Sequence, residues 1–593
     1  MRLPISDRHR ELVISVLNPV TVFCGASALA LLVAVMGWPM EDEMRILVRA
    51  ITAAILTAFV VQEVLRFAVQ SRPLRFLRER YLEAILALAA AVELLFGEPI
   101  LGWIGQRTDL PGSTITVIYL AATQLTLVIL TGLRALRSNS FLSGRRLSPG
   151  MVFILSFALL ITLGTLLLKT PQATVSGIGW VDACFTATSA VCVTGLITVD
   201  MEQTFTRHGQ WIILGLIQVG GLGVMTITYF FAYFFAGGVT LRNRIALQDL
   251  LCEENLGHIG TVLGVIVGFT LVTEIVGAIA IYLFLSAGGS AGADPAFFSL
   301  FHSVSAFCNA GFSTLGNGLA DASLVGQTSV FSIIMILIVG GGIGFPVVKN
   351  LLLVSLARVA RFLGLRSAVA PRLTTNSQIV LFTTLSLLAG GTVIIWLTEF
   401  VFGHGVANGS GWFTALFHAV TARTAGFNIT PVGSLLPATA AVMMFLMFVG
   451  GSPSSTAGGI KTTTLAVAFM AVRRVLLGRT EIEAFGRRLG EDVTNRALAI
   501  VLLAVGFITI TTTALCALHP ELSPADLTFE AVSAVSTVGL TRGVTPQVGD
   551  AAKWVLVTAM FVGRIGVLLF LLSFIRKRPA TGYRLPETNV VLT

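Results

Sequence analysis

Long apolar runs recur along the whole chain, and they limit the possible folds more than any other feature. Many of them contain about eighteen or more residues, enough for a helix to cross a bilayer core of roughly 30 Å. Of the 593 residues, 55% are hydrophobic and 12% are charged, whereas soluble domains carry about 25% charged residues. The chain is therefore predicted to be an all-α polytopic membrane protein.

Basic residues gather at alternate ends of the apolar runs, and the intervening loops are nearly free of them. The clusters are Arg72, Arg75, Arg78 and Arg80; Arg134, Arg137, Arg145 and Arg146; Arg358, Arg361, Arg366 and Arg372; Arg473, Arg474, Arg479, Arg487 and Arg488; and Arg576, Lys577 and Arg578. Loops rich in Arg and Lys face the cytoplasm. Both termini are therefore predicted to be cytoplasmic, and the net charge of +9 needs no nucleic-acid partner.

The first apolar run argues against a cleaved signal peptide, and the cysteines argue against a disulfide framework or a metal site. The run from Val13 to Trp38 is too long for a signal-peptide core and has no small-residue cleavage site after it, so we expect a retained helix. The six cysteines lack CxxC spacing, which favours buried thiols over disulfides or a metal site.

Four short segments of similar sequence lie between pairs of apolar runs. They read FTATSAVCVTGL, FHSVSAFCNAGF, FHAVTARTAGF and FEAVSAVSTVGL, and they begin at Phe185, Phe301, Phe417 and Phe529. Each has Ser or Thr four residues after the Phe and then a Gly followed by Leu or Phe; the third is one residue shorter. One such segment alone would read as a packed turn. Four at nearly constant spacing indicate four repeats of one structural unit.

Each segment is too short to span a membrane. The flanking runs are 149–169 and 210–236, 259–286 and 329–357, 376–402 and 438–472, and 494–518 and 551–575. Each segment is therefore expected to enter the membrane from the extracellular side and return to it. Non-helical backbone at that depth is tolerated only against protein or water, which predicts a pore with pseudo-fourfold symmetry.

The predicted organisation has six parts. These are 1–148, with about four extra transmembrane helices near 13–37, 46–70, 81–97 and 113–136; pore repeats at 149–258, 259–375, 376–493 and 494–578; and a C-terminal tail at 579–593. A scaffold or dimer-contact role is the simplest interpretation of the first part.

The glycine that ends each segment predicts an ion-binding site. Glycine permits backbone angles that turn carbonyl oxygens toward the axis, and rings of carbonyls can replace the hydration shell of a monovalent cation. The predicted filter residues, and so the predicted K+ site, are Val193, Thr194, Gly195, Asn309, Ala310, Gly311, Thr424, Ala425, Gly426, Thr537, Val538 and Gly539. No carboxylate lies in these stretches, which disfavours a divalent-selective site.

Several ionisable residues lie close to the predicted filter. His302, His418 and Glu530 share one aligned position directly after the Phe, early in the predicted short helix. We expect them to face its surroundings or a vestibule rather than to bind a metal. Arg423 lies three residues before Gly426, and we expect its side chain to turn away and brace the loop, because a cation aimed into a cation filter would oppose ion entry.

The second run of each pair carries a glycine cluster, at Gly220, Gly340, Gly450 and Gly563. Small residues allow close helix packing or a break. In the third repeat the cluster continues into GGSPSSTAGGIKTTT, which is predicted to interrupt a spanning helix on the cytoplasmic side of the filter and to face the pore. Lys461 at this depth costs about 2.5–3.5 kcal/mol, so we expect water or a carboxylate near it.

Two other classes of function are less consistent with the sequence. A nucleotide-binding loop requires Gly directly before Lys, but Ile460 intervenes and no β-strand precedes, so an ATP-hydrolysing enzyme is disfavoured. A proton-coupled symporter would place ionisable groups within helices. Glu274 and Glu399 are candidates, although Glu274 is better explained as a buried partner of a polar group and Glu399 as interfacial.

Taken together, the four repeats, the single-glycine filters, TARTAGFN, GGSPSSTAGGIKTTT and MFVGRIG closely resemble the Trk/Ktr/HKT superfamily of potassium-translocating subunits, over roughly residues 149–593. The resemblance implies a K+ uptake channel or transporter, not an enzyme, in the bacterial inner membrane. Na+ permeation or proton-coupled K+ symport are the alternatives. Plant relatives that favour sodium often have Ser at the first filter glycine, so Gly195 implies potassium.

The resemblance also implies partners. These are a second copy of the chain, in a homodimer, and a cytosolic RCK-type (KtrA/TrkA-like) regulatory ring that binds ATP/ADP or NAD(H), with no cofactor on this chain. The tail YRLPETNVV resembles the Ktr C-terminus, which lies at the dimer interface.

In the matching family the interrupting stretch is an intramembrane loop that obstructs the pore. This implies a gating role for Gly450, Gly451, Ser452, Pro453, Ser454, Ser455, Thr456, Ala457, Gly458, Gly459 and Lys461. Arg564 lies in the glycine cluster of the fourth repeat. From this aligned position we expect its guanidinium to bind loop carbonyls and to hold the loop across the pore.

Overall fold

The computed structural model describes residues 42–69, 149–236, 259–287, 294–364, 372–401 and 411–574, together with 91–92 and parts of 17–38. Helix α2 (Asp42–Val69) matches the predicted helix near 46–70. The predicted helix near 113–136, nearly all of the one near 81–97, and the tail 579–593 lie outside the described residues, as do the basic clusters at 72–80, 134–146 and 576–578.

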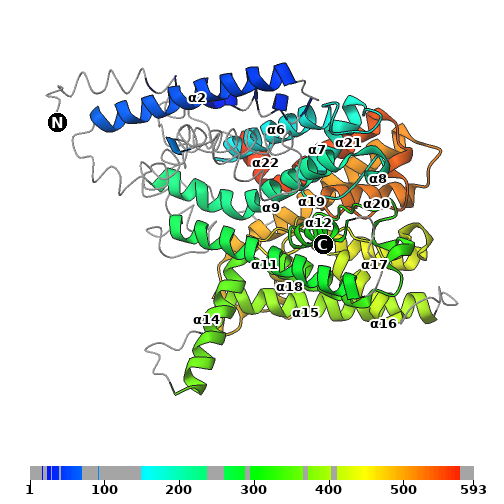
Figure 1. The fold of residues 1–593 in the computed structure, drawn as a ribbon. Helices are drawn as coiled ribbons and strands as arrows, with labels where there is room; N and C mark the ends of the chain where they lie inside the picture. Colours follow the sequence, from blue (N-terminus) through cyan, green and yellow to red (C-terminus); the bar gives the residue numbers. More distant parts are fainter. Residues whose placement is uncertain are drawn as a thin grey trace.

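Four units of the same construction follow one another along the chain (Figure 1). Their first helices are α6 (Pro149–Leu168), α11 (Ile259–Ala287), α15 (Thr375–Trp396) and α19 (Glu491–Leu518). The short helices, called pore helices below, are α7 (Trp180–Val191), α12 (Pro295–Phe307), α16 (Gly411–Thr421) and α20 (Pro524–Val535). The third helices are α9 (Arg207–Ala236), α13 (Thr328–Ile343) with α14 (Phe345–Phe362), α17 (Pro437–Phe448) with α18 (Thr462–Leu476), and α21 (Asp550–Ile565) with α22 (Val567–Phe574).

Shorter elements complete the described chain. They are α8 (Met201–Thr204), the 3₁₀ helices η2 (Gly318–Ala320), η3 (Ala322–Leu324), η5 (Val432–Ser434) and η6 (Thr545–Gln547), and a π-helical turn at Leu397–Val401. Strands β1 (Ile482–Ala484) and β2 (Arg487–Leu489) form an antiparallel hairpin in which Ile482 pairs with Leu489. Phe485 and Gly486 both have positive φ, as a two-residue type I′ turn requires.

Three described helices are long and apolar enough to cross a membrane, namely Gly264–Ser286, Thr375–Glu399 and Glu491–Leu518. Two further candidate spans are broken. The bend is 102° between α13 and α14 and 88° between α21 and α22, and α14 extends away from the body in Figure 1. The runs 329–357 and 551–575 are thus not straight helices, because Gly344 and Gly566 adopt φ of 86° and 89° at the breaks.

The four units pack in a ring. Helix α9 of the first repeat contacts α11 and α12, α13 of the second contacts α15 and α16, α17 of the third contacts α20, and α21 of the fourth contacts α7 of the first. The chain therefore closes on itself in the order of its repeats, which is the arrangement that four repeats around one pore require.

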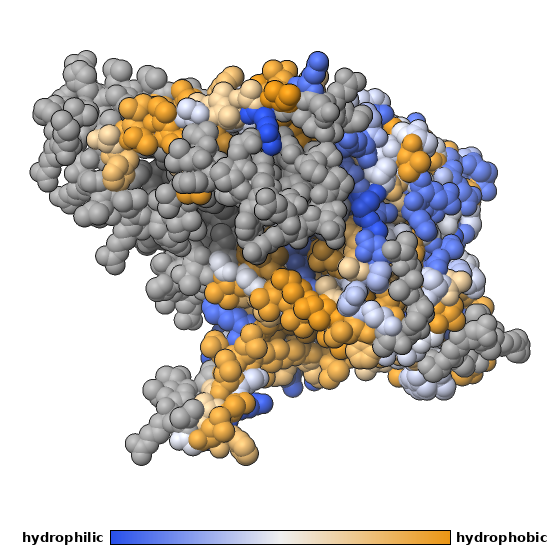
Figure 2. All heavy atoms as spheres, in the orientation of Figure 1, coloured by the Kyte–Doolittle hydropathy of each residue, from blue (hydrophilic) through white to orange (hydrophobic). Residues whose placement is uncertain are grey.

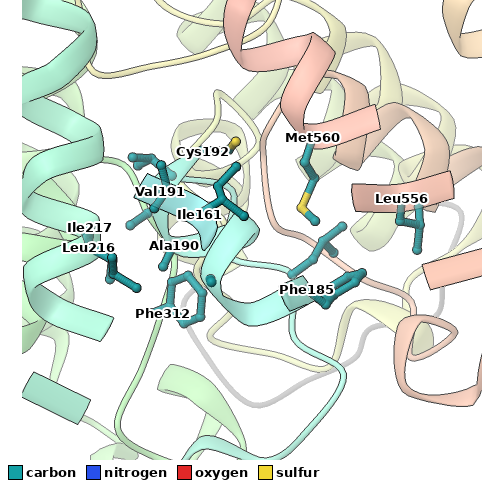
Figure 3. Close-up of a cluster of buried hydrophobic side chains, with 14 of the residues drawn as sticks. Ile161, Phe185, Ala190, Val191, Cys192, Leu216, Ile217, Phe312, Leu556 and Met560 are labelled. Carbon is teal, nitrogen blue, oxygen red and sulfur yellow. The ribbon is translucent and has the colours of Figure 1, made fainter. Parts of the chain in front are cut away.

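The phenylalanine that begins each repeated segment anchors the core. Phe185, Phe301, Phe417 and Phe529 are all 0% exposed. Figure 3 shows Phe185 of α7 beside Leu556 and Met560 of α21. By contrast, the outer faces of α11 and α15 are largely hydrophobic, and hydrophilic residues gather at the end of the molecule where α8 and α20 lie (Figure 2). Apolar outer faces are what a lipid environment requires of these helices.

Candidate ion pathway

The four predicted filter glycines lie together in a closed ring. Each glycine faces a carbonyl oxygen of the next repeat so closely that an added Cβ would lie less than 3.0 Å from it: Gly195 faces Ala310 O, Gly311 faces Ala425 O, Gly426 faces Val538 O, and Gly539 faces Thr194 O. Any side chain at these positions would collide with a neighbouring strand. The ring therefore requires glycine in all four repeats.

The four segments 193–195, 309–311, 424–426 and 537–539, called filter strands below, share one backbone pattern. The four glycines have φ between 72° and 94°, and the residue two positions earlier also has positive φ, at Val193, Asn309, Thr424 and Thr537. Asparagine tolerates this conformation, but β-branched residues rarely adopt it. Such strained backbone persists only where the surroundings impose it, and it is concentrated at functional sites.

The Ser or Thr four residues after each Phe imposes part of this geometry. In every repeat its carbonyl oxygen accepts the N–H of the residue before the filter glycine, from Thr194, Ala310, Ala425 and Val538. The hydroxyls of Ser189 and Ser533 also accept the N–H of Gly195 and Gly539, at 3.0 and 3.1 Å. The hydroxyls of Ser305 and Thr421 instead donate to the carbonyls of Phe312 and Phe427.

The third repeated segment is one residue shorter than the others, and the difference lies at the end of its pore helix. Helix α16 ends at Thr421, four residues after its Phe, whereas the other pore helices end six residues after theirs. The positions of positive φ relative to the glycine are unchanged. The deletion therefore shortens the helix and preserves the filter strand.

The ionisable residues directly after the Phe brace the chain beyond the filter. His302 Nε2 is 2.9 Å from Ser313 Oγ, and His418 Nε2 is 2.9 Å from Thr430 Oγ1. Glu530 accepts hydrogen bonds from the hydroxyls of Thr541 and Thr545 and from the Arg542 N–H. All three side chains are 0–1% exposed. Their side chains bind the chain that follows each filter strand and do not point at the ring of glycines. Among the described residues, no group of three or more His, Cys, Asp or Glu side chains could hold a metal ion.

Glycines of the third helices pack on the ends of the pore helices. A Cβ at Gly220, Gly341 or Gly563 would lie less than 3.0 Å from the carbonyl of the last pore-helix residue of the same repeat, which is Val191, Phe307 or Val535. In the second repeat the close contact is made by Gly341, and an added Cβ at Gly340 has nothing within 4 Å. Close helix packing therefore explains the cluster in these three repeats.

In the third repeat the glycine cluster is the start of a loop, residues 450–461, which connects α17 and α18. The loop is closed at its base, where the Gly450 N–H donates to Ile460 O at 2.9 Å. Its middle packs against the second repeat: Thr456 Oγ1 donates to the Phe307 carbonyl at 3.1 Å, and the N–H groups of Ser452 and Thr456 donate to Gly342 and Gly341. A Cβ added at Gly458 would collide with the hydroxyl of Thr537 in the fourth filter strand. The loop therefore lies against the filter.

Three cationic side chains bind carbonyl oxygens of this loop. Arg564 Nη1 donates to Thr456 O at 2.6 Å, Arg423 Nη2 to Gly450 O at 3.1 Å, and Lys461 Nζ to Ala457 O at 2.7 Å. The expected contact of Arg564 is present. Arg423 turns away from the filter as expected, and the sequence does not predict its contact with the loop at residues 450–461. The partner of Lys461 among the described residues is this loop carbonyl and not a carboxylate.

Two carboxylates within helices have structural partners. Glu274 of α11 is 2% exposed and accepts a hydrogen bond from Gln218 Nε2 at 3.0 Å, which agrees with a buried partner of a polar group. Cys308 Sγ lies 3.6 Å from the second carboxylate oxygen. Glu399 accepts the Leu436 N–H at 3.1 Å, at the start of α17.

The chain is similar to proteins of known family. Residues 122–583 match the family model described as TrkH, cation transport protein. The chain is 35% identical to the potassium/sodium uptake protein NtpJ of Enterococcus hirae, covering 76% of this chain and 98% of that protein. It is also 35% identical to the Ktr system potassium uptake protein B of Bacillus subtilis, covering 77% and 99%.

A solved structure has a similar fold. It is the potassium transporter TrkH from Vibrio parahaemolyticus, with a TM-score of 0.58, 18% identity, and coverage of 84% of this chain and 96% of that chain. The family match begins at residue 122, upstream of the 149 expected from the motifs, and leaves residues 1–121 outside it. The chain belongs to the TrkH/Ktr family of cation transport proteins.

Proposed function

We propose that the chain is a potassium uptake channel subunit that conducts K+ through the ring of single glycines. The main support for the proposal is the closed ring of filter glycines. Each glycine lies so close to a carbonyl oxygen of the next repeat that no side chain fits between them. A pore lined by carbonyl oxygens would suit a dehydrated monovalent cation, and the four filter stretches contain no carboxylate. The K+ ligands would come from residues 193–195, 309–311, 424–426 and 537–539.

The loop at residues 450–461 is the proposed gate. The proposal is supported by the hydrogen bond of Thr456 to Phe307 at the end of a pore helix, by the lack of space for a side chain between Gly458 and Thr537, and by the three cationic side chains that bind the loop. Positive charge close to a cation pathway raises the energy of an entering K+ ion. The closed state would therefore block conduction both sterically and electrostatically, and opening would require Arg564 to release Thr456.

The proposed assembly is a homodimer in the bacterial inner membrane, with both termini cytoplasmic. A cytosolic RCK-type ring that binds ATP/ADP or NAD(H) would control the loop, and this chain itself would hold no cofactor and catalyse no reaction. Support comes from relatives named as components of a Ktr system. The basic residues Arg473, Arg474, Arg487 and Arg488 lie at one end of α18 and in the β-hairpin that follows it, as the cytoplasmic side requires.

Sodium permeation is the second candidate, favoured by one relative whose name includes both ions. Proton-coupled symport is a further alternative. Purified protein in liposomes distinguishes them: we expect Rb+ uptake down its gradient without ATP or a proton gradient, and inhibition by K+ more than by Na+. Strict dependence on a pH gradient would instead establish symport, and uptake of Na+ at a rate similar to that of Rb+ would establish Na+ permeation.

A further inference from the structure

Arg423 stands where the other repeats carry a small residue. It directly precedes Thr424, the filter residue with φ of 70°, and the residues in this position of the other repeats are Cys192, Cys308 and Ser536. Its side chain is 8% exposed. A guanidinium is costly at membrane depth, so its presence at this one position calls for a specific partner.

That partner is the first residue of the loop. Arg423 Nη2 donates to Gly450 O at 3.1 Å, Nε has no hydrogen-bond partner, and no described carboxylate forms an ion pair with the guanidinium. Charged hydrogen bonds of this kind are stronger than neutral ones. Among the described residues, the carbonyl of Gly450 therefore provides the polar contact of a buried charge.

Gly450 is also where the loop closes. Its N–H donates to Ile460 O, and a Cβ on Gly450 would collide with Gly458 O. Arg423 thus holds the base of the loop, where its two ends meet, and Arg564 holds Thr456 near its middle. The two arginines come from different repeats and bind different carbonyls, so each restrains a different part of the same loop.

We propose that Arg423 is a second positioning residue of the gate, which ties the base of the loop to the third filter strand. The inference rests on the proposed function, because it assigns a role within that gate. Since Arg423 lies between Ala422 and Thr424, displacement of the loop base must pull on the filter strand itself. Loss of the contact should release the loop while leaving the other three filter strands in place.

The test uses the full-length protein in liposomes and three variants. Arg423→Met removes the donor with an apolar side chain of similar length, Arg423→Lys keeps one charged donor, and Arg207→Met is the control, since Arg207 pairs with Asp294 in a half-exposed ion pair. The first readout is the maximal rate and half-saturating concentration of Rb+ uptake. The second is deuterium exchange of backbone amides in residues 450–461.

We expect Arg423→Met to raise the maximal basal rate by about tenfold or more, the shift that loss of one charged hydrogen bond produces, with an unchanged half-saturating concentration. Exchange in the loop should rise in parallel. Arg423→Lys should recover most of the wild-type behaviour, and Arg207→Met should show none of these changes. If Arg423→Met is not recovered as folded protein, Arg423→Gln replaces it with the same expectations.

Other outcomes separate the two proposals. Unchanged loop exchange in Arg423→Met would overturn the inference, whether or not ion affinity changes, because Arg423 would then support only the filter. Increased loop exchange in a protein whose wild-type form conducts no K+ or Rb+ would uphold the contact and overturn the proposed function.

Discussion

The guanidinium of Arg564, in α21, donates a 2.6 Å hydrogen bond to the carbonyl oxygen of Thr456, which lies 108 residues earlier in the loop of the third repeat. A second nitrogen lies 3.4 Å from Gly220 O in α9 of the first repeat. One buried side chain therefore links three of the four repeats, at the level where the loop meets the filter. This link gives the loop a defined resting position.

Replacement of Arg564 should release the loop. Arg564→Ala removes a charged hydrogen bond worth roughly 1.5–3 kcal/mol, so we expect basal Rb+ flux in liposomes to rise by about tenfold or more. Arg564→Lys should have a smaller effect, because Lys retains one charged donor. Flux equal to that of the wild type in the Ala variant would contradict a restraining role for Arg564.

Shortening the loop should act in the same direction. Deletion of Pro453, Ser454 and Ser455 removes the part of the loop between the two anchoring N–H groups of Ser452 and Thr456, together with the contact of Ser454 O with the Phe345 N–H. Basal flux should increase at unchanged K+ preference over Na+, measured by competition. A deletion variant that folds but conducts no more than the wild type would remove the loop from the gating mechanism.

Gly195→Ser should weaken the preference for K+. The new Cβ would collide with Ala310 O, and φ of 94° is unfavourable for serine. Gly177→Ser is a matched control, because Gly177 also has positive φ, at 83°, but has open space around it. We expect the ratio of Na+ to K+ inhibition of Rb+ uptake to rise only in Gly195→Ser. An equal effect in the control would attribute the change to backbone strain rather than to the ring.

The brace beyond the fourth filter strand should contribute to stability. Glu530→Ala leaves two hydroxyls and the Arg542 N–H without their acceptor, at a cost of at least about 1–3 kcal/mol. The variant should therefore unfold at a lower temperature in detergent. Glu521→Ala is the control, since this glutamate is 62% exposed in its pair with His519. Equal unfolding temperatures for the two variants would show that the hydrogen bonds of Glu530 are replaced by water.

Glu274 tests the symport alternative. Its carboxylate already has partners in Gln218 and Cys308, and Gln in its place retains hydrogen-bonding capacity without a titratable proton. Glu274→Gln should therefore leave Rb+ uptake unchanged over a range of imposed pH gradients. Loss of gradient-driven accumulation, with passive exchange retained, would identify Glu274 as a proton carrier and contradict the channel mechanism.

Several of these features could be predicted from the sequence because they are repeated. The four phenylalanines, the Ser or Thr four residues later and the filter glycines recur in register, so the pore helices and the ring follow from their spacing. The loop could be recognised because fifteen small and polar residues in a spanning segment have no lipid-compatible conformation. The closeness of Arg564 to the loop followed from its place in the fourth glycine cluster.

Features that are not shared by all four repeats could not be predicted in this way. The sequence predicts that the Arg423 side chain turns away from the filter. It does not predict that its hydrogen-bond partner is Gly450, 27 residues later. The sharp breaks at Gly344 and Gly566 depend on positive φ, which one glycine among several in a cluster does not reveal. The hydroxyl of Ser189 accepts a hydrogen bond from Gly195, whereas that of Ser305 donates one to Phe312, although both residues occupy the same aligned position.

The most direct test of the central claim is an experimental structure with Rb+ or Tl+, in which anomalous scattering locates the ion. The proposed filter predicts a peak on the axis of the ring formed by Gly195, Gly311, Gly426 and Gly539, within coordination distance of carbonyl oxygens from all four strands. A conducting protein with no anomalous peak at that ring, and its bound ion elsewhere, would contradict the assignment.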